Sequence, residues 1–230
     1  MVDTVKKMNL HVHTKFSDGL FTPREIIEAS VKYGLDIIGI SDHFHTVKTK
    51  SVMRKHVNEY IKELTNLKDD FKKYIDVKIG MEIDTCPFRT NIETFPFDLC
   101  ESMDYVLMEY VNEPLRGGIP LSTAVKLRSK FDCEVGLAHN DIEKNFGDYD
   151  LLKKKLEENN IFIELASGIR NTRDNKPYYH YAPDFFNSLN GSRIKISVGT
   201  DMHRYLRELA MINDAYRFIK NMGIEDHLIY

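Results

Sequence analysis

The chain has 230 residues, 42% of them hydrophobic and 11% aromatic, which is enough apolar material to bury a sizeable core. Its formal net charge of −3 argues against a broad basic surface for long nucleic acid, but it is compatible with a small phosphorylated substrate. No stretch approaches the roughly 20 apolar residues of a membrane helix, so we expect no membrane association.

The cysteines and the first residues favour a reducing compartment. Cys86, Cys100 and Cys133 are widely spaced and form no C-x-x-C pair, which argues against a disulfide framework. The opening residues, MVDTVKK, are charged and lack the apolar stretch of a secretion signal. We therefore expect a cytoplasmic protein, and the sequence leaves its oligomeric state open.

Short apolar runs alternate with amphipathic segments along the chain, starting with a strand and then a well-marked helix. That helix has Thr22 as N-cap, Pro23 at its first position, Glu25 completing a capping box and Gly34 as C-cap. The predicted strands are 8–12, 36–41, 77–83, 104–109, 134–138, 161–166 and 195–200. The predicted helices are 22–34, 48–74 (long or broken), 120–131, 148–159, 181–190 and 205–222, with a loop over 84–97.

Seven strand–helix units recur at a spacing of about 30 residues, which is typical of a parallel sheet. No linker and no shift in composition divides the chain. We therefore predict one α/β domain over 1–230, and a single α/β barrel falls within this size range.

Side chains that can bind metal follow nearly every predicted strand. In parallel barrels and sheets, functional groups gather at the C-terminal ends of the strands, so these side chains should share one rim. Asp18 follows the first strand in a Ser-Asp-Gly turn. The others are His11, His13, Asp42, His43, Glu82, Asp84, Glu109, His139, Glu164, Asp201 and His203.

Two pairs sharpen this pattern. His11 and His13 project to one face of their strand, and so do Asp201 and His203. The first and last strands are neighbours in a closed barrel, so these four side chains should converge. Imidazole and carboxylate ligands together suit Zn, Mn or Fe, and their number exceeds what one tetrahedral ion needs. We predict two or three divalent ions. The histidines expected not to bind metal are His45, His56, His180 and His227.

Taken singly, these residues are weak signals. A lone His-x-His pair is more often incidental, and His139 alone would be read as a buried, hydrogen-bonded histidine. Asp18 alone would be read as a turn residue, because Asp-Gly favours turns. The combination carries the prediction, because five of the nine histidines lie at predicted strand ends.

The same residues resemble the PHP (polymerase and histidinol phosphatase) family of metal-dependent phosphoesterases. The resemblance implies a distorted seven-stranded βα barrel, TIM-like in form, with a multinuclear metal site at its C-terminal rim and Glu82 bridging two ions. The matching segments, in family order, are HVHTKFSDG (11–19), GISDH (39–43), GME (80–82), AH (138–139) and GTDMHR (199–204). The implied ligands are His11, His13, Asp18, His43, Glu82, His139, Asp201 and His203.

One position departs from the family pattern. The family's fourth strand usually continues into a segment that supplies a histidine ligand, whereas DYVLMEYVNE (104–113) contains none. Glu109 lies nearest and is our candidate substitute. The occupancy of a third ion is therefore left open.

The functional hypothesis is metal-assisted hydrolysis of a phosphoester, either histidinol phosphate or another small phosphate. A bound divalent ion lowers the pKa of its water to about 7, so hydroxide exists at neutral pH. We predict Glu82, Asp201 and His203 to be catalytic. Arg170 and Arg204 are the predicted phosphate-binding residues, with Arg173 as a third choice, because arginine binds phosphate through two donors. Asp42 and Glu164 are expected to orient ligand imidazoles.

Three alternatives remain at this point. The first is a PHP-type nuclease or phosphodiesterase acting on short nucleic acid or nucleotides. The second is an amidohydrolase-type metal hydrolase, which also begins with His-x-His but typically has a bridging lysine on strand four, where this chain has Glu109. The third is a non-catalytic metal-binding module, in which more ligands would be lost.

Overall fold

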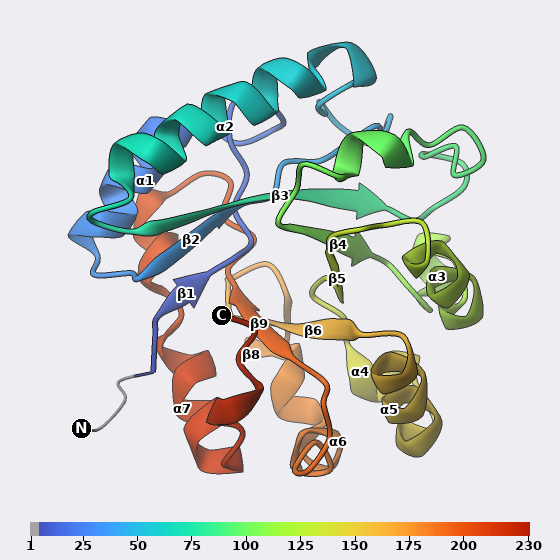
Figure 1. Ribbon diagram of the computed structural model, residues 1–230. Helices are drawn as coiled ribbons and strands as arrows, with labels where there is room; N and C mark the ends of the chain where they lie inside the picture. The colour runs from blue at the N-terminus through green and yellow to red at the C-terminus, as the bar shows by residue number, and fades with distance from the viewer. Residues whose placement is uncertain (1–4) are drawn as a thin grey trace.

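The computed structural model describes residues 5–230, so the first four residues of MVDTVKK lie outside it. Seven parallel strands form a nearly closed barrel whose strand order, β1-β2-β3-β4-β5-β6-β9, follows the chain (Figure 1). The predicted seven-stranded α/β barrel is confirmed. Its strands are β1 (Met8–Asn9), β2 (Ile37–Ile40), β3 (Asp76–Asp84), β4 (Tyr105–Glu109), β5 (Glu134–Leu137), β6 (Ile161–Ala166) and β9 (Ile196–Gly199).

The barrel closes between its first and last strands. The Leu10 amide donates to the Val198 carbonyl at 2.8 Å, and the His13 amide donates to the Met202 carbonyl at 2.9 Å. The predicted first strand, 8–12, is regular only over Met8–Asn9, after which pairing continues through an isolated bridge between Val12 and Met202. This closure brings residues 11–13 and 201–203, which follow the first and last strands, to the same part of the rim.

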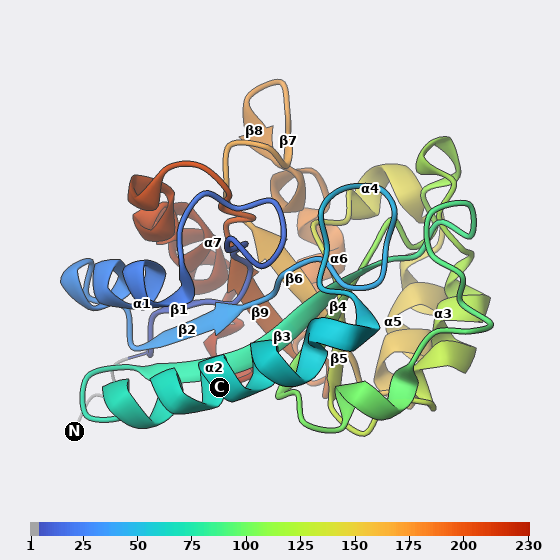
Figure 2. The same ribbon diagram turned by 90° about the horizontal axis from the view of Figure 1, so that it is seen from above.

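Helices surround the strands (Figures 1 and 2). The first begins at the predicted capping box: the Glu25 amide donates to Thr22 Oγ1 at 3.3 Å, and the Thr22 amide donates to the Glu25 carboxylate at 2.8 Å. Gly34 follows the C-cap Tyr33 in the left-handed conformation, with φ of 71°. The helices are α1 (Pro23–Lys32), α2 (Val57–Phe71), α3 (Leu121–Arg128), α4 (Ile142–Asn145), α5 (Tyr149–Glu158), α6 (Pro183–Asn187) and α7 (Asn213–Met222).

Three helix predictions were too long. Residues 48–53 form a loop because Val52 pairs with the chain after β2: its amide donates to the His43 carbonyl at 2.8 Å. The helix predicted over 181–190 is confined to α6, which begins at Pro183 after a 3₁₀ turn. The helix predicted over 205–222 is divided into a 3₁₀ segment, Leu206–Ala210, and α7.

Two elements were not predicted. They are the short helix α4 and a hairpin of β7 (Thr172–Arg173) and β8 (Lys176–Pro177). Figure 2 shows this hairpin and the loop between β2 and α2 rising on the same side of the barrel. Lys48 of that loop, and Arg170 and Asn171 just before the hairpin, line a cavity at the C-terminal rim.

A single aromatic side chain fills much of the barrel interior below the rim. Tyr105 is fully buried, and its hydroxyl donates to the Leu10 carbonyl at 2.5 Å. Gly39 and Gly80 lie against this ring, and an added Cβ would stand 2.2 Å and 2.3 Å from its atoms. The two glycines therefore make room for Tyr105, whose ring closes the barrel interior beneath the C-terminal rim.

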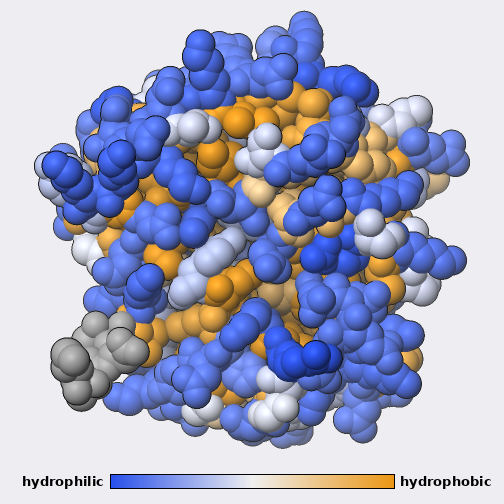
Figure 3. Space-filling view, viewed as in Figure 1, coloured by the Kyte–Doolittle hydropathy of each residue, from blue (hydrophilic) through white to orange (hydrophobic). Residues whose placement is uncertain are grey.

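Hydrophilic residues cover most of the face seen in Figure 3, with hydrophobic residues visible between them. Within residues 5–230, no helix has both the length and the apolar character required to cross a bilayer. The cysteines Cys86, Cys100 and Cys133 are buried with free thiols. They behave as small core residues, as expected.

Candidate metal centre

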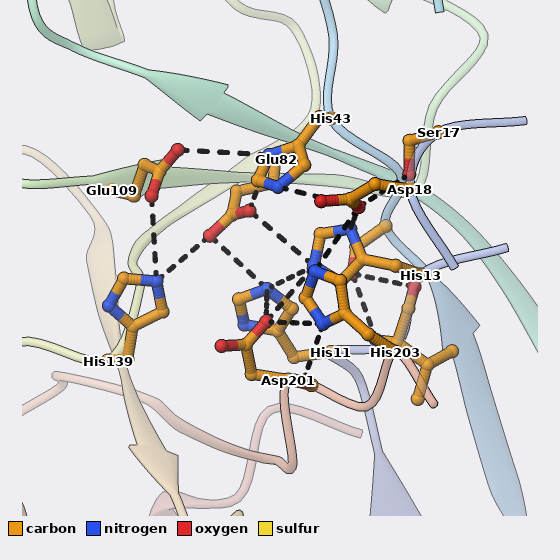
Figure 4. Close-up of polar contacts among 12 residues, drawn as sticks. His11, His13, Ser17, Asp18, His43, Glu82, Glu109, His139, Asp201 and His203 are labelled. Atoms are coloured by element: carbon orange, nitrogen blue, oxygen red, sulfur yellow. Dashed lines mark hydrogen bonds and ion pairs between the residues drawn. The ribbon is translucent and has the colours of Figure 1, made fainter. Parts of the chain in front are cut away.

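Four imidazoles surround the carboxylate of Glu82, which projects from β3 (Figure 4). Its Oε1 lies 3.2 Å from His11 Nε2 and 3.1 Å from His139 Nε2. Its Oε2 lies 2.9 Å from His43 Nδ1 and 3.5 Å from His13 Nε2. The histidines come from the ends of β1, β2 and β5, so the barrel brings distant parts of the chain to one carboxylate.

Candidate ligands that follow the last strand join this cluster. Asp201 Oδ1 lies 3.2 Å from His13 Nε2 and 3.5 Å from His203 Nδ1. His203 Nε2 lies 3.2 Å from Asp18 Oδ1, which is 3.8 Å from His43 Nε2. The predicted convergence of side chains from the first and last strands is confirmed.

Glu109, at the end of β4, reaches the same cluster. Its two oxygens lie 3.7 Å from His43 Nδ1 and 3.8 Å from His139 Nε2. Both oxygens also accept hydrogen bonds from the Lys48 ammonium at 2.8 Å. An ionised carboxylate has about four acceptor sites, so Glu109 can hold Lys48 and still offer a lone pair to an ion. Lys48 was missed because the sequence pattern placed it in a helix.

Glu164 supports the cluster from β6. It accepts a hydrogen bond from His11 Nδ1 at 2.9 Å and another from the His139 amide at 2.7 Å. The predicted orienting contact to an imidazole is present, and it leaves His11 Nε2 facing the cluster. Gly199 is required beside this pair, because an added Cβ would stand 2.0 Å from Glu164 Oε1 and 2.5 Å from the Cβ of His11.

Asp42 acts differently from its prediction. Within residues 5–230 its carboxylate orients no imidazole and instead accepts from the amide and hydroxyl of both Thr14 and Ser17, at 2.5–3.1 Å. These four hydrogen bonds hold the turn that carries Asp18. The prediction for Asp42 was wrong because its side chain points toward the turn at Thr14 and Ser17, while the next side chain, His43, points toward Glu82.

Two of the assembled residues have strained backbones. His139 has φ of 30° and Asp201 has φ of 51°, in the left-handed region that non-glycine residues seldom adopt. Each such residue costs about 1–3 kcal/mol and persists only where its surroundings hold it. Here both conformations turn a side chain from a strand end into the cluster.

The imidazoles of the cluster differ in their pKa values. Burial lowers the pKa of His11, His43 and His139, but Glu82 and the other nearby carboxylates more than offset it, so these pKa values are raised, to about 9 for His139. Burial, together with the neighbouring His203 and His43, lowers the pKa of His13 to about 3, so its ring is neutral at pH 7. Burial raises the pKa of Asp18, but His203, His43 and His13 more than offset it and keep that pKa well below its ordinary value. Neutral imidazole and ionised carboxylate are the forms that bind metals.

The donor set fits divalent ions. His13 Nδ1, His43 Nδ1 and Glu82 Oε2 are buried without a hydrogen bond, although each has polar neighbours. A buried polar atom without a partner costs about 1–3 kcal/mol, which coordination of an ion offsets. Three groups have ligand atoms within 4.8 Å of one another: His13/Asp18/His43/His203, His11/His13/Glu82 and His43/Glu82/Glu109. Because these groups share members, the cluster suits more than one ion.

A cavity of about 390 Å³ opens over the cluster. Arg170, which follows β6, lines it. Arg204 is exposed and does not line this cavity. Arg173 bonds to Glu143 at 2.8 Å and lies 3.5 Å from Asp141, away from the ligands. Of the three arginines considered from the sequence, Arg170 is therefore the best placed.

The four histidines expected not to bind metal belong to none of these ligand groups, all of which lie within residues 5–230. His180 Nε2 lies 2.6 Å from Asp214, and His227 Nδ1 donates to the Ile194 carbonyl at 2.7 Å. Asn171 was not considered from the sequence, yet its Nδ2 donates to Asp201 Oδ2 at 3.1 Å. No local pattern in the sequence would have indicated that contact.

The model of the PHP domain matches residues 9–172, most of the chain. The chain belongs to the PHP domain family. Membership agrees with the barrel and with the ligand cluster at its C-terminal rim, and it sets aside the amidohydrolase alternative. Histidinol-phosphatase of Lactococcus lactis subsp. lactis (strain IL1403) is 24% identical, with 96% of this chain and 93% of that protein covered.

Other known proteins match less of the sequence or match through structure. The DNA polymerase/3'-5' exonuclease PolX of Bacillus subtilis (strain 168) is 31% identical over 44% of this chain and 17% of its own length. A crystal structure of the Lactococcus lactis histidinol phosphate phosphatase is also similar; it contains zinc, L-histidinol and phosphate. Its TM-score is 0.66 at 20% sequence identity, and the match covers 95% of this chain and 94% of that chain. The crystal structure of a putative histidinol phosphatase from Listeria monocytogenes has the same TM-score at 14% identity. The match covers 91% of this chain and 100% of that chain.

Replacing Glu109 by glutamine tests the ligand that departs from the family pattern. The amide carries no charge and is a poorer metal ligand, so the variant should hold about one ion fewer per chain. Elemental analysis after equilibration with zinc measures this number, with Glu134→Gln, an exposed site on β5, as the control. An unchanged stoichiometry would mean that Glu109 holds Lys48 and not an ion.

Proposed function

We propose that this PHP protein is a metal-dependent phosphatase that hydrolyses a small phosphomonoester. The observation that carries the proposal is the cluster of five imidazoles and four carboxylates beneath a cavity with Arg170 on its wall. Two or three divalent ions bound there would supply a water of pKa about 7 and an electrophilic face for phosphoryl oxygens. Their ligands would be His11, His13, Asp18, His43, Glu82, Glu109, His139, Asp201 and His203.

The chain's own residues have distinct parts in this proposal. Glu82, Asp201 and His203 are the proposed catalytic residues, because they border the cavity as well as the cluster. Arg170 would bind phosphoryl oxygens through its guanidinium, which offers two parallel donors. Glu164 would fix His11, and Asn171 would fix Asp201, so that both ligands keep one orientation.

The relatives support a phosphomonoester as substrate. The curated relative that matches nearly the whole chain is a histidinol-phosphatase, and its structure contains zinc, L-histidinol and phosphate. We therefore propose zinc first, then manganese or iron, and histidinol phosphate as the first substrate to try. The three free cysteines support a cytoplasmic location.

A nuclease or phosphodiesterase activity is the second candidate, because the PolX match includes an exonuclease. That match covers 44% of this chain, and the net charge of −3 disfavours long nucleic acid. The monoester proposal therefore comes first.

A substrate panel tests the proposal. Purified protein is treated with a chelator, reloaded with zinc, manganese or iron, and assayed on histidinol phosphate, other phosphomonoesters, a phosphate diester and labelled single-stranded DNA. We expect metal-dependent turnover of at least one monoester at about 100 times the diester rate, a difference of about 2.7 kcal/mol in barrier height. Turnover of the diester or DNA alone would support the second candidate. Metal binding without any turnover would indicate a non-catalytic module.

Replacing the two predicted phosphate-binding arginines compares their roles. Arg170→Ala should raise KM for a phosphomonoester by about 10-fold or more, since one charge-assisted hydrogen bond is worth about 1.5–3 kcal/mol. Arg204→Ala should have a smaller effect, because Arg204 is exposed outside the cavity. Steady-state kinetics with metal analysis provides the measurement. An equal effect in both variants would mean that bound substrate draws Arg204 into the site.

A further inference from the structure

The loop between β2 and α2 holds the backbone of Lys48 in a defined place over the rim. The Val47 amide donates to the Arg89 carbonyl at 2.9 Å, and the Lys48 amide donates to Thr46 Oγ1 at 3.1 Å. The far end of the loop is fixed by the bridge between Phe44 and Val52. The side chain of Lys48 therefore starts from a fixed point above the ligand cluster.

The ammonium of Lys48 is only partly used by the protein. It carries three donors, and two of them meet the Glu109 oxygens at 2.8 Å. Its Nζ also lies 4.8 Å from the centre of the Tyr110 ring, which restricts it on one side. Within residues 5–230 the ammonium makes no third hydrogen bond of normal length, and the side chain of Tyr110 is its other polar neighbour. The side chain is 25% exposed and lines the same 390 Å³ cavity as Arg170.

Lys48 and Arg170 approach that cavity from different sides. Lys48 follows β2 and Arg170 follows β6, and these strands are not adjacent in the barrel order. A phosphate dianion over the cluster could thus meet cations from two separate parts of the rim.

We propose that Lys48 positions the substrate, donating its third N–H to a non-bridging phosphoryl oxygen while Glu109 holds the ammonium in place. The inference rests on the proposed phosphatase function and adds a residue to it. Lys48 bonds to Glu109, a proposed ligand, but its replacement leaves both Glu109 oxygens available to an ion, so its loss should affect phosphate binding more than metal content.

The test uses the metal-loaded full chain and compares Lys48→Met with Lys50→Met, an exposed lysine of the same loop. Lys48→Met should raise KM for a phosphomonoester and the inhibition constant of inorganic phosphate by about 10-fold or more, with kcat changed by less than about 3-fold. Zinc content should stay at the wild-type value, and Lys48→Arg should restore part of the phosphate affinity. Lys50→Met should match the wild type.

Two outcomes would overturn the inference: unchanged KM and phosphate inhibition in Lys48→Met, or an altered zinc content that accounts for any loss. Calorimetric binding of inorganic phosphate separates this test from that of the proposed function. If the wild type binds phosphate about 10 times more tightly than Lys48→Met but hydrolyses no monoester, the inference holds and the proposed function fails. If turnover is present and both proteins bind phosphate equally, the proposed function holds and the inference fails.

Discussion

Replacing Asp201 by asparagine is expected to reduce kcat/KM by more than about 100-fold while the protein remains folded. Supporting residues behind a metal ligand already account for about 10- to 100-fold, so a direct ligand should account for more. Asp201 lies 3.2 Å from His13 Nε2 and 3.5 Å from His203 Nδ1, so its carboxylate is placed to share an ion with both rings. Asparagine keeps the size of the side chain and tolerates the left-handed backbone at this position.

The matched control for this change is Asp69→Asn, whose side chain is 74% exposed on α2. Circular dichroism and thermal melting check that both variants fold, and elemental analysis reports the bound metal. If Asp201→Asn keeps its turnover, and the wild type also keeps its turnover after chelation, the metal hypothesis is wrong.

Replacing Glu82 by glutamine should have the largest effect on metal binding. Its carboxylate lies within 3.5 Å of His11, His13, His43 and His139 and takes part in two of the three ligand groups. Losing its charge should remove at least one ion per chain and abolish detectable turnover. Elemental analysis measures the first effect, with Glu59→Gln on an exposed part of α2 as control.

The same variant provides a measurement that does not depend on activity. A ligand present at 100 times its dissociation constant stabilises the folded state by about 2.7 kcal/mol. For a domain of this size, that corresponds to a rise in Tm of about 5–10 °C. Zinc should therefore raise the Tm of the wild type by this amount and that of Glu82→Gln by clearly less. Equal shifts in both proteins would show that Glu82 is not a principal ligand.

The features of this protein that could be predicted from the sequence are those that depend on residues close together in the chain. The capping box of Thr22 and Glu25 is a contact over three residues, and it appears as predicted. His11 and His13 point to the same side of the chain, and so do Asp201 and His203, because side chains in a strand alternate with a period of two residues. The seven strands were placed to within a few residues for the same reason, except that β1 is regular only over Met8–Asn9.

The failures that affected the candidate site involve contacts between distant residues. The helix predicted from residue 48 does not begin there because Val52 pairs with His43 after β2, and the periodicity of the segment carries no sign of that pairing. Lys48 consequently went unnoticed, although it is the cation nearest to Glu109. Asp42 was predicted to orient a ligand imidazole, whereas it accepts hydrogen bonds from the turn that carries Asp18.

The sequence by itself therefore determined which side chains stand at the strand ends and which face each one takes, because both depend on local backbone geometry. Only the tertiary structure decided that they meet. The barrel closes through hydrogen bonds such as that between Leu10 and Val198, and the unusual backbones at His139 and Asp201 turn two side chains inward. Distances among side-chain tips depend on the sum of many such long-range packing contacts, which no local pattern of residues encodes.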